Sequence, residues 1–150
     1  ADGLNDPHNL GSIIRSANAA GAHGVIIPKN RSVSLNSVVA KVSTGAVEYT
    51  PVARVTNIAQ TIEKLKKEGL WICGTALEAS EDYFDADLTG ALAIVIGSEG
   101  EGISRIVRES CDFLVKIPMK GQTESLNASV AAGILLYESL RQRNAANKKG

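Results

Sequence analysis

Two short runs of consecutive apolar residues constrain the fold more than any other feature of the sequence. They read Leu-Trp-Ile-Cys-Gly at 70–74 and Ala-Leu-Ala-Ile-Val-Ile at 91–96. A strand with no polar face is typical of a parallel sheet that helices cover on both sides. Segments with the helical spacing of apolar residues alternate with such runs along the chain. The sequence therefore predicts an α/β fold, a mainly parallel sheet flanked by helices.

The remaining elements follow from periodicity and from residues that break it. Further strands are predicted at 25–27, 50–55 and 113–117. Apolar stripes predict helices at 10–17, 35–42, 58–65, 103–107 and 126–140. Asn57 and Gln60 resemble a capping pair at the start of the third of these helices. The chain fits a single domain over 1–143, followed by a polar tail at 144–150 that we expect to fray.

Charge and cysteine content exclude several classes of protein. The 150 residues carry 16 Lys and Arg against 16 Asp and Glu, so the net charge is zero and any RNA contact must be local. Cys73 and Cys111 lie far apart with no Cys/His spacing, so neither a disulfide framework nor a metal site is predicted. No apolar run approaches the length of a membrane span, and the first residues lack the regions of a signal peptide. We expect a cytoplasmic protein with no membrane partner.

A polar loop leads into the first predicted helix, and Arg15 lies off the apolar stripe of that helix. Its neighbours at spacings of three and four are small or polar, namely Gly11, Ser12, Asn18 and Ala19. This composition leaves room for a substrate to approach the guanidinium. The alternative is a solvated arginine on an exposed helix face.

A glycine-rich loop, Gly97-Ser98-Glu99-Gly100-Glu101-Gly102, follows the apolar run at 91–96. Glycines let the backbone come close to a ligand, and ligands of open α/β sheets lie at the carboxyl ends of strands. The order of the glycines matches neither the dinucleotide fingerprint nor the P-loop, and two carboxylates repel a pyrophosphate. A ligand with hydroxyls or positive charge fits better. A tight strand-to-helix turn is the alternative.

The segment from Ile117 to Ser129 connects the last predicted strand to the C-terminal helix. Free amides at that helix start can hold an anion, but Ser125 and Asn127 can equally be caps that satisfy those amides. The helix then carries a group of small residues, Ala128, Ala131, Ala132 and Gly133. Such a face suits close packing, either within the core or against a partner subunit.

Together these segments resemble the three motifs of the SpoU family of RNA ribose 2′-O-methyltransferases, within the SPOUT superfamily. The first motif resembles Asn9-x5-Arg15, and the second resembles the segment from Ile96 to Gly102. The third resembles Ile117-Pro118-Met119 followed by Ser125-Leu126-Asn127-Ala128-Ser129-Val130-Ala131. The match spans nearly the whole chain. In their individual residues, the motifs are most similar to those of the bacterial branch that methylates a guanosine of 23S ribosomal RNA.

The resemblance implies more than periodicity can show. It implies a SPOUT fold whose C-terminal part forms a deep trefoil knot, an exception to the usual rules of chain connection. It also implies S-adenosylmethionine as the cofactor, an RNA substrate, and a homodimer with the active site completed near the subunit boundary. Members of this branch usually carry an additional N-terminal RNA-binding domain, so we expect this chain to be the catalytic domain.

The resemblance also implies roles for individual residues. The implied catalytic residues are Arg15, Asn9, Glu99, Ser125 and Asn127. The implied cofactor-binding residues are Thr75, Ala76, Leu77, Ile96, Gly97, Gly102, Ile117, Met119, Ser125, Leu126 and Ala128. A guanidinium stays protonated, so we expect Arg15 to lower the pKa of the ribose hydroxyl or to hold an adjacent phosphate, in preference to acting as a literal base.

Three alternatives to a ribosomal RNA methyltransferase differ from it in the class of protein or in the substrate. One is a module that binds RNA or a nucleotide without catalysis, and another is a tRNA ribose 2′-O-methyltransferase of the same family. The third is a nucleotide-dependent oxidoreductase, which requires the phosphate loop that the glycine order at 97–102 does not match.

Overall fold

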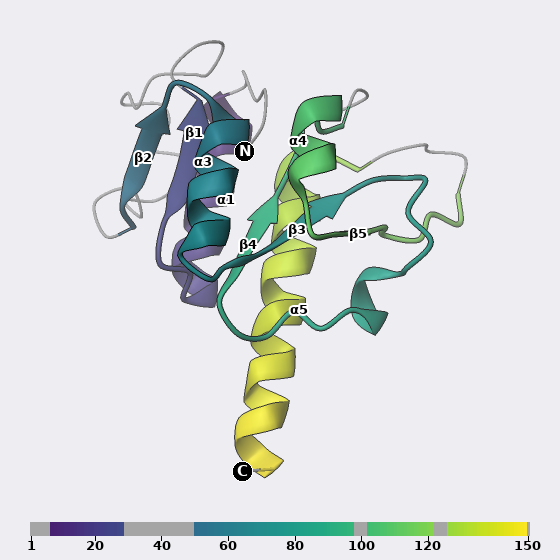
Figure 1. The fold of residues 1–150 in the computed structure, drawn as a ribbon. Helices are drawn as coiled ribbons and strands as arrows, with labels where there is room; N and C mark the ends of the chain where they lie inside the picture. Colours follow the sequence, from purple (N-terminus) through teal and green to yellow (C-terminus); the bar gives the residue numbers. More distant parts are fainter. Residues whose placement is uncertain (1–6, 29–49, 98–101, 122–125, 150) are drawn as a thin grey trace.

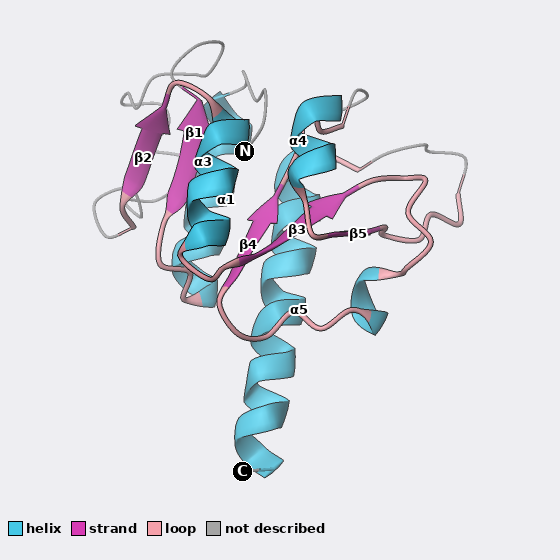
Figure 2. Ribbon diagram, viewed as in Figure 1, coloured by secondary structure: helices cyan, strands magenta, loops and turns pink. Residues whose placement is uncertain are grey.

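The computed structural model describes residues 7–28, 50–97, 102–121 and 126–149, and its strands form two parallel sheets (Figures 1 and 2). In the first sheet β1 (Val25–Pro28) pairs with β2 (Val52–Val55). In the second, β3 (Trp71–Thr75) lies between β4 (Leu92–Val95) and β5 (Phe113–Val115). The predicted α/β fold with parallel strands flanked by helices is confirmed. The division of the described strands into two sheets was not predicted.

Helices cover both faces of the β4-β3-β5 sheet, as the unbroken apolar runs require. Neighbouring strand residues point to opposite faces, and Ile72 and Cys73 accordingly belong to different core clusters. Ile72 packs with α3 (Ile58–Lys67) and α4 (Arg105–Ser110). Cys73 packs with α5 (Ala128–Lys149), which runs along the sheet and extends beyond it at its C-terminal end (Figure 1).

The first helix, α1 (Pro7–Ala20), shows the predicted stripe, because its apolar members Leu10, Ile13, Ile14 and Ala17 are all buried. Three of them pack against β1, whereas Ile13 joins the cluster around α5. The helix ends at Gly21, whose φ of 83° lies in the left-handed region. The amides of Gly21 and Ala22 bond back to Asn18 and Ala17, which closes a Schellman motif.

The other helix starts also follow from local side chains. The Asn57 side chain accepts a 3.0 Å hydrogen bond from the amide of Gln60, which confirms the predicted capping pair. Ser104 caps α4 in the same way through the amide of Val107. The predicted helix at 35–42 lies outside the described residues.

Some details differ from the sequence prediction. The last helix begins at Ala128, so Leu126 precedes it, and Val130 on its first turn is exposed. Ile106 is 66% exposed because it lies on the side of α4 away from the core. The polar tail, which we expected to fray, is helical as far as Lys149. Alanines within it favour a helix, and no glycine interrupts it before the last residue.

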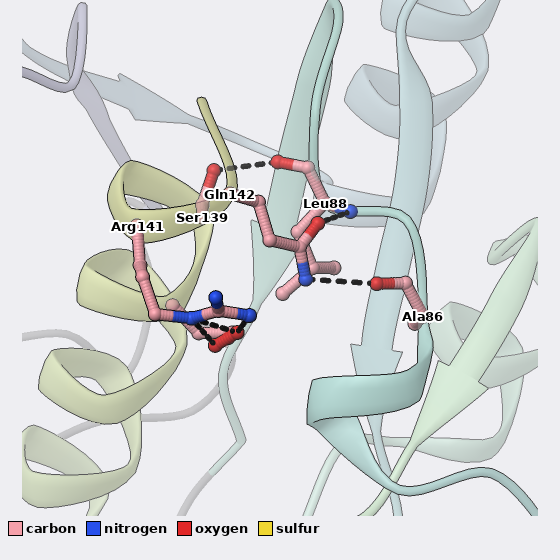
Figure 3. Close-up of polar contacts among 6 residues, drawn as sticks. Ala86, Leu88, Ser139, Arg141 and Gln142 are labelled. Atoms are coloured by element: carbon pink, nitrogen blue, oxygen red, sulfur yellow. Dashed lines mark hydrogen bonds and ion pairs between the residues drawn. The ribbon is translucent and has the colours of Figure 1, made fainter. Parts of the chain in front are cut away.

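The amide of Gln142 ties α5 to the segment between β3 and β4 (Figure 3). Its Oε1 accepts a 2.7 Å hydrogen bond from the amide of Leu88, and its Nε2 donates to the Ala86 carbonyl at 2.9 Å. The Ser139 hydroxyl donates to the Leu88 carbonyl at 2.6 Å. One side chain thus satisfies a donor and an acceptor of a backbone segment that contains the fully buried Leu88.

We expect Gln142→Ala to lower the free energy of unfolding by about 1–3 kcal/mol, because it leaves both backbone groups without a partner. Asn147→Ala, at an exposed position on the same helix, is the matched control and should leave stability within about 0.5 kcal/mol of the parent. Chemical denaturation of the two variants measures the difference. Equal stabilities would show that the Gln142 amide does not anchor α5.

Candidate functional site

A cavity of about 250 Å³ lies where the carboxyl ends of β3, β4 and β5 meet the start of α5. Because these strands are parallel, their carboxyl ends share one edge of the sheet, the position at which open α/β sheets bind ligands. The lining residues are Thr75, Ala76, Leu77, Glu78, Ile96, Gly97, Gly102, Ile103, Arg108, Val115, Lys116, Ile117, Met119, Leu126, Ala128 and Ala131. The walls are mainly apolar, and the charged side chains come from Glu78, Arg108 and Lys116.

The backbone of Gly97 comes very close to that of Gly102 on this cavity wall. A Cβ placed on Gly97 would lie 2.1 Å from the carbonyl carbon of Gly102 and 2.3 Å from the amide nitrogen of Ile103. No side chain fits there unless the backbone moves. Gly102 itself has a φ of 71°, which favours glycine. The two ends of the glycine-rich loop are therefore held together, while Glu99 lies outside the described residues.

The structure brings the predicted cofactor-binding residues together around this cavity. Every one of them that the structure describes is among the lining residues, although they come from four separate stretches of sequence. Ser125, predicted for both catalysis and cofactor binding, lies outside the described residues. Apolar walls and a few convergent polar groups suit a small ligand with a flat ring, so the cradle fits an adenosyl group.

Sequence reasoning missed several lining residues, namely Glu78, Ile103, Arg108, Val115, Lys116 and Ala131. Glu78 and Lys116 directly follow predicted residues or the strand end, and a search of strand termini could have found them. Arg108 lies on α4, and nothing in its local sequence indicates a cavity. Its guanidinium forms an ion pair with Glu78, a contact between residues far apart in the chain.

Asn127 is the cap of α5. Its Oδ1 accepts a 2.8 Å hydrogen bond from the amide of Ser129, and its carbonyl accepts the first helical bond from Ala131 at 3.0 Å. The sequence left open whether the amides at this helix start hold an anion or are capped by side chains. For Asn127 the structure supports capping. Leu126 and Ala128, on either side of this cap, line the cavity, so the cap also sets the position of the helix start at the cavity wall.

Arg15 is exposed on α1 and is not among the residues that line the cavity. Asn9, six residues earlier on the same helix, is buried. The helix that carries both packs along α5, where Ile13 shares a core cluster with Ile96 and Ala128. The structure therefore places Arg15 on a surface next to the cavity-lining elements, not within the cavity of one chain.

The described part of the chain holds no alternative chemical centre. Burial raises the pKa of the Cys73 thiol to about 12 and that of Cys111 to about 11, so neither is a nucleophile at neutral pH. Both thiols are free. Across 7–28, 50–97, 102–121 and 126–149, no three His, Cys, Asp or Glu side chains are grouped to hold a metal ion. No described helix has the length and apolar character to cross a membrane.

Comparison with known proteins agrees with this architecture. The chain is 59% identical over 143 residues to YacO, a TrmH family protein of Bacillus subtilis. That match covers 95% of this chain and 57% of the relative, so the chain spans little more than half of the length of such relatives. The SpoU methyltransferase AviRb of Streptomyces viridochromogenes, solved in complex with AdoMet, is 36% identical, with a TM-score of 0.87 over 94% of this chain and 58% of AviRb.

A second solved structure extends the match over more of the relative. The TrmH/SpoU tRNA modifying enzyme of A. aeolicus is 30% identical with a TM-score of 0.89, and the match covers 97% of this chain and 74% of that one. Its fold confirms the SPOUT-like arrangement. The profile of the SpoU rRNA methylase family matches residues 1–137. On these grounds, the chain belongs to the SpoU family of RNA methyltransferases.

Proposed function

We propose that this chain is the catalytic domain of an enzyme that transfers a methyl group from S-adenosylmethionine to a ribose 2′-hydroxyl of RNA. One observation carries the proposal: the described residues of the second and third motifs converge on one cavity at the carboxyl ends of parallel strands. Membership of the SpoU family supports the same reaction. A solved structure with 39% identity and a TM-score of 0.87, an RNA 2′-O ribose methyltransferase, supports the site of transfer.

The cavity provides what an adenosyl cofactor needs. Ile117, Met119 and Leu126 offer an apolar surface for the adenine ring, and backbone at Gly97 and Gly102 comes close enough for main-chain contacts. When bound, S-adenosylmethionine supplies an electrophilic methyl group on its sulfonium. AviRb, with its AdoMet complex, is the relative that supports this assignment.

Arg15 acts on the acceptor side of the reaction. A ribose hydroxyl is a poor nucleophile at neutral pH, and a fixed positive charge next to it lowers its pKa or holds the adjacent phosphate. The exposed guanidinium, flanked by the small residues Gly11, Ser12 and Ala19, is open to an RNA strand. Asn9, Glu99, Ser125 and Asn127 are the other polar residues that we assign to substrate positioning and to the loops that border the site.

We assign a guanosine of 23S ribosomal RNA as the substrate. The residues of the motifs and the name of the matching SpoU rRNA methylase family support this assignment. A tRNA ribose is the second candidate, because the matching A. aeolicus protein is a tRNA modifying enzyme. Either substrate places the reaction in the cytoplasm. Zero net charge agrees with RNA recognition that depends in part on sequence outside this chain.

We further propose a homodimer and a C-terminal trefoil knot, as the family resemblance implies. Val130 and Tyr137 are both about half exposed and lie two turns apart on one side of α5. Tyr137 also borders a shallow hollow with Leu140 and Arg141. A second copy packed on this side of α5 would cover the exposed apolar groups. As the family resemblance implies, we propose that the active site is completed near this subunit boundary.

If the cavity holds S-adenosylmethionine, Ala131→Leu should weaken its binding by about tenfold or more, because the larger side chain occupies the cavity. Ala146→Leu, at an exposed position on the same helix, is the control and should leave binding unchanged. Calorimetric titration measures both. Equal dissociation constants for the two variants would remove the cavity as the cofactor site.

Arg15→Ala should reduce methyl transfer to RNA on the order of 100-fold while the affinity for S-adenosylmethionine is retained. Arg105→Ala removes an exposed cation that pairs only locally, with Glu109, and serves as the control. Transfer of a labelled methyl group is measured with full-length protein, on ribosomal RNA and on tRNA in parallel. Full activity of Arg15→Ala would refute the assigned role, and preferential labelling of tRNA would replace the ribosomal substrate with the second candidate.

Tyr137→Lys places a charge on the proposed dimer surface and should convert the protein to a monomer in sedimentation velocity experiments. Ala53→Lys, on an exposed position of β2, should remain a dimer. A parent protein that sediments as a monomer, or a Tyr137→Lys variant that stays dimeric, would rule out this face of α5 as the interface.

A further inference from the structure

Glu78 is the sole carboxylate among the described residues that line the cavity. It lies in the loop after β3, three residues beyond Thr75, and its side chain is about half exposed. An acidic side chain just past the carboxyl end of a parallel strand is well placed to accept hydrogen bonds from a ribose. The two hydroxyls of an adenosyl ribose are donors that need an acceptor, and Glu78 is the one negatively charged acceptor among the described lining residues.

Arg108, which also lines the cavity, forms an ion pair with this carboxylate. Its Nη1 contacts the Oε1 of Glu78, so the pair joins α4 to the loop after β3. Both side chains are more than a third exposed. An ion pair this exposed contributes little to folding stability, because water solvates both charges in the unfolded and the folded protein. Stability therefore does not account for its position.

The Nε of Arg108 provides a second, independent observation. This atom is buried and has no hydrogen-bond partner within the part of the chain that the structure describes. A buried N–H without an acceptor is unfavourable, and the guanidinium cannot lose its charge. The side chain that carries it lines the cavity, where its Nη1 pairs with Glu78. Glu78 and Arg108 together offer an acceptor and a donor, and a sugar hydroxyl both donates and accepts.

We propose that Glu78 binds the ribose diol of the adenosyl group and that Arg108 is the positioning residue that orients the Glu78 carboxylate. This inference rests on the proposed function, because it assumes an adenosyl ligand in the cavity. It assigns the selection of a ribonucleoside over a deoxyribonucleoside to one ion pair. A deoxy ligand loses a hydrogen bond to the Glu78 carboxylate, which then keeps only its pairing with Arg108 and water.

Calorimetric titration with S-adenosylhomocysteine and with its 2′-deoxy and 3′-deoxy analogues tests the inference without any turnover. The parent protein should bind at least one deoxy analogue about tenfold or more weakly than the ribose form. In Glu78→Ala the ribose form should weaken by about as much, and the preference over the deoxy analogue should fall to about twofold or less. Glu81→Ala removes a neighbouring exposed carboxylate outside the cavity and should retain the full preference.

Arg108→Met separates positioning from a structural role. It should weaken S-adenosylhomocysteine binding and reduce the preference for ribose, and Arg108→Lys should restore part of that preference because an ammonium can still pair with Glu78. A lowered melting temperature with an unchanged preference would show that the pair is only structural and would overturn the inference.

The remaining outcomes separate this inference from the function on which it rests. If the parent binds S-adenosylhomocysteine and both deoxy analogues equally well, the diol assignment is wrong and the cofactor assignment stands. If folded parent protein binds none of the three, the cofactor assignment fails and the diol assignment fails with it.

Discussion

The burial of the first turns of α5 against the β4-β3-β5 sheet is the constraint on which the rest of the structure depends. Ala128, Ala132 and Leu135 lie in one core cluster with residues of the sheet and with Ile13 of α1. Small side chains let the helix approach closely, and Gly133 lies against Ser16 of α1. This packing places the helix start at the edge where three parallel strands end. The cavity is what remains between those strand ends and the helix.

The candidate site thus has two parts, a cavity between the strand ends and α5, and the exposed Arg15 on α1. The cavity is enclosed by backbone contacts such as that of Gly97 with Gly102, which admit no side chain. Arg15, in contrast, lies on the outer side of a helix whose inner side is core. Under the proposed function, the cofactor must be held rigidly, whereas the RNA strand must enter and leave. A cavity at the sheet edge suits the first demand, and an exposed cation on an adjacent helix suits the second.

The sequence predicted the parallel strands, the buried stripe of α1 and the Asn57 cap, because each depends on periodicity or on contacts within one turn of helix. The residues that motif resemblance assigned to cofactor binding, where the structure describes them, line one cavity, although no geometric argument from the sequence brought them together. The sequence did not predict the pairing of Glu78 with Arg108, since no local pattern joins residues thirty positions apart. The polar composition of the C-terminal tail predicts fraying, but its alanines favour the helix that extends to Lys149.

Under the proposed function, the methyl group reaches a ribose 2′-oxygen of RNA. Incubation of full-length protein with S-adenosylmethionine and RNA, followed by alkaline hydrolysis and mass spectrometry of the RNA, tests this assignment. A 2′-O-methyl group blocks attack of that oxygen on the neighbouring phosphate. We expect a methylated dinucleotide that resists alkali, with the added mass on the sugar. A methyl group on a base in fully cleaved nucleotides, or no added mass with protein that binds the cofactor, would contradict the assignment.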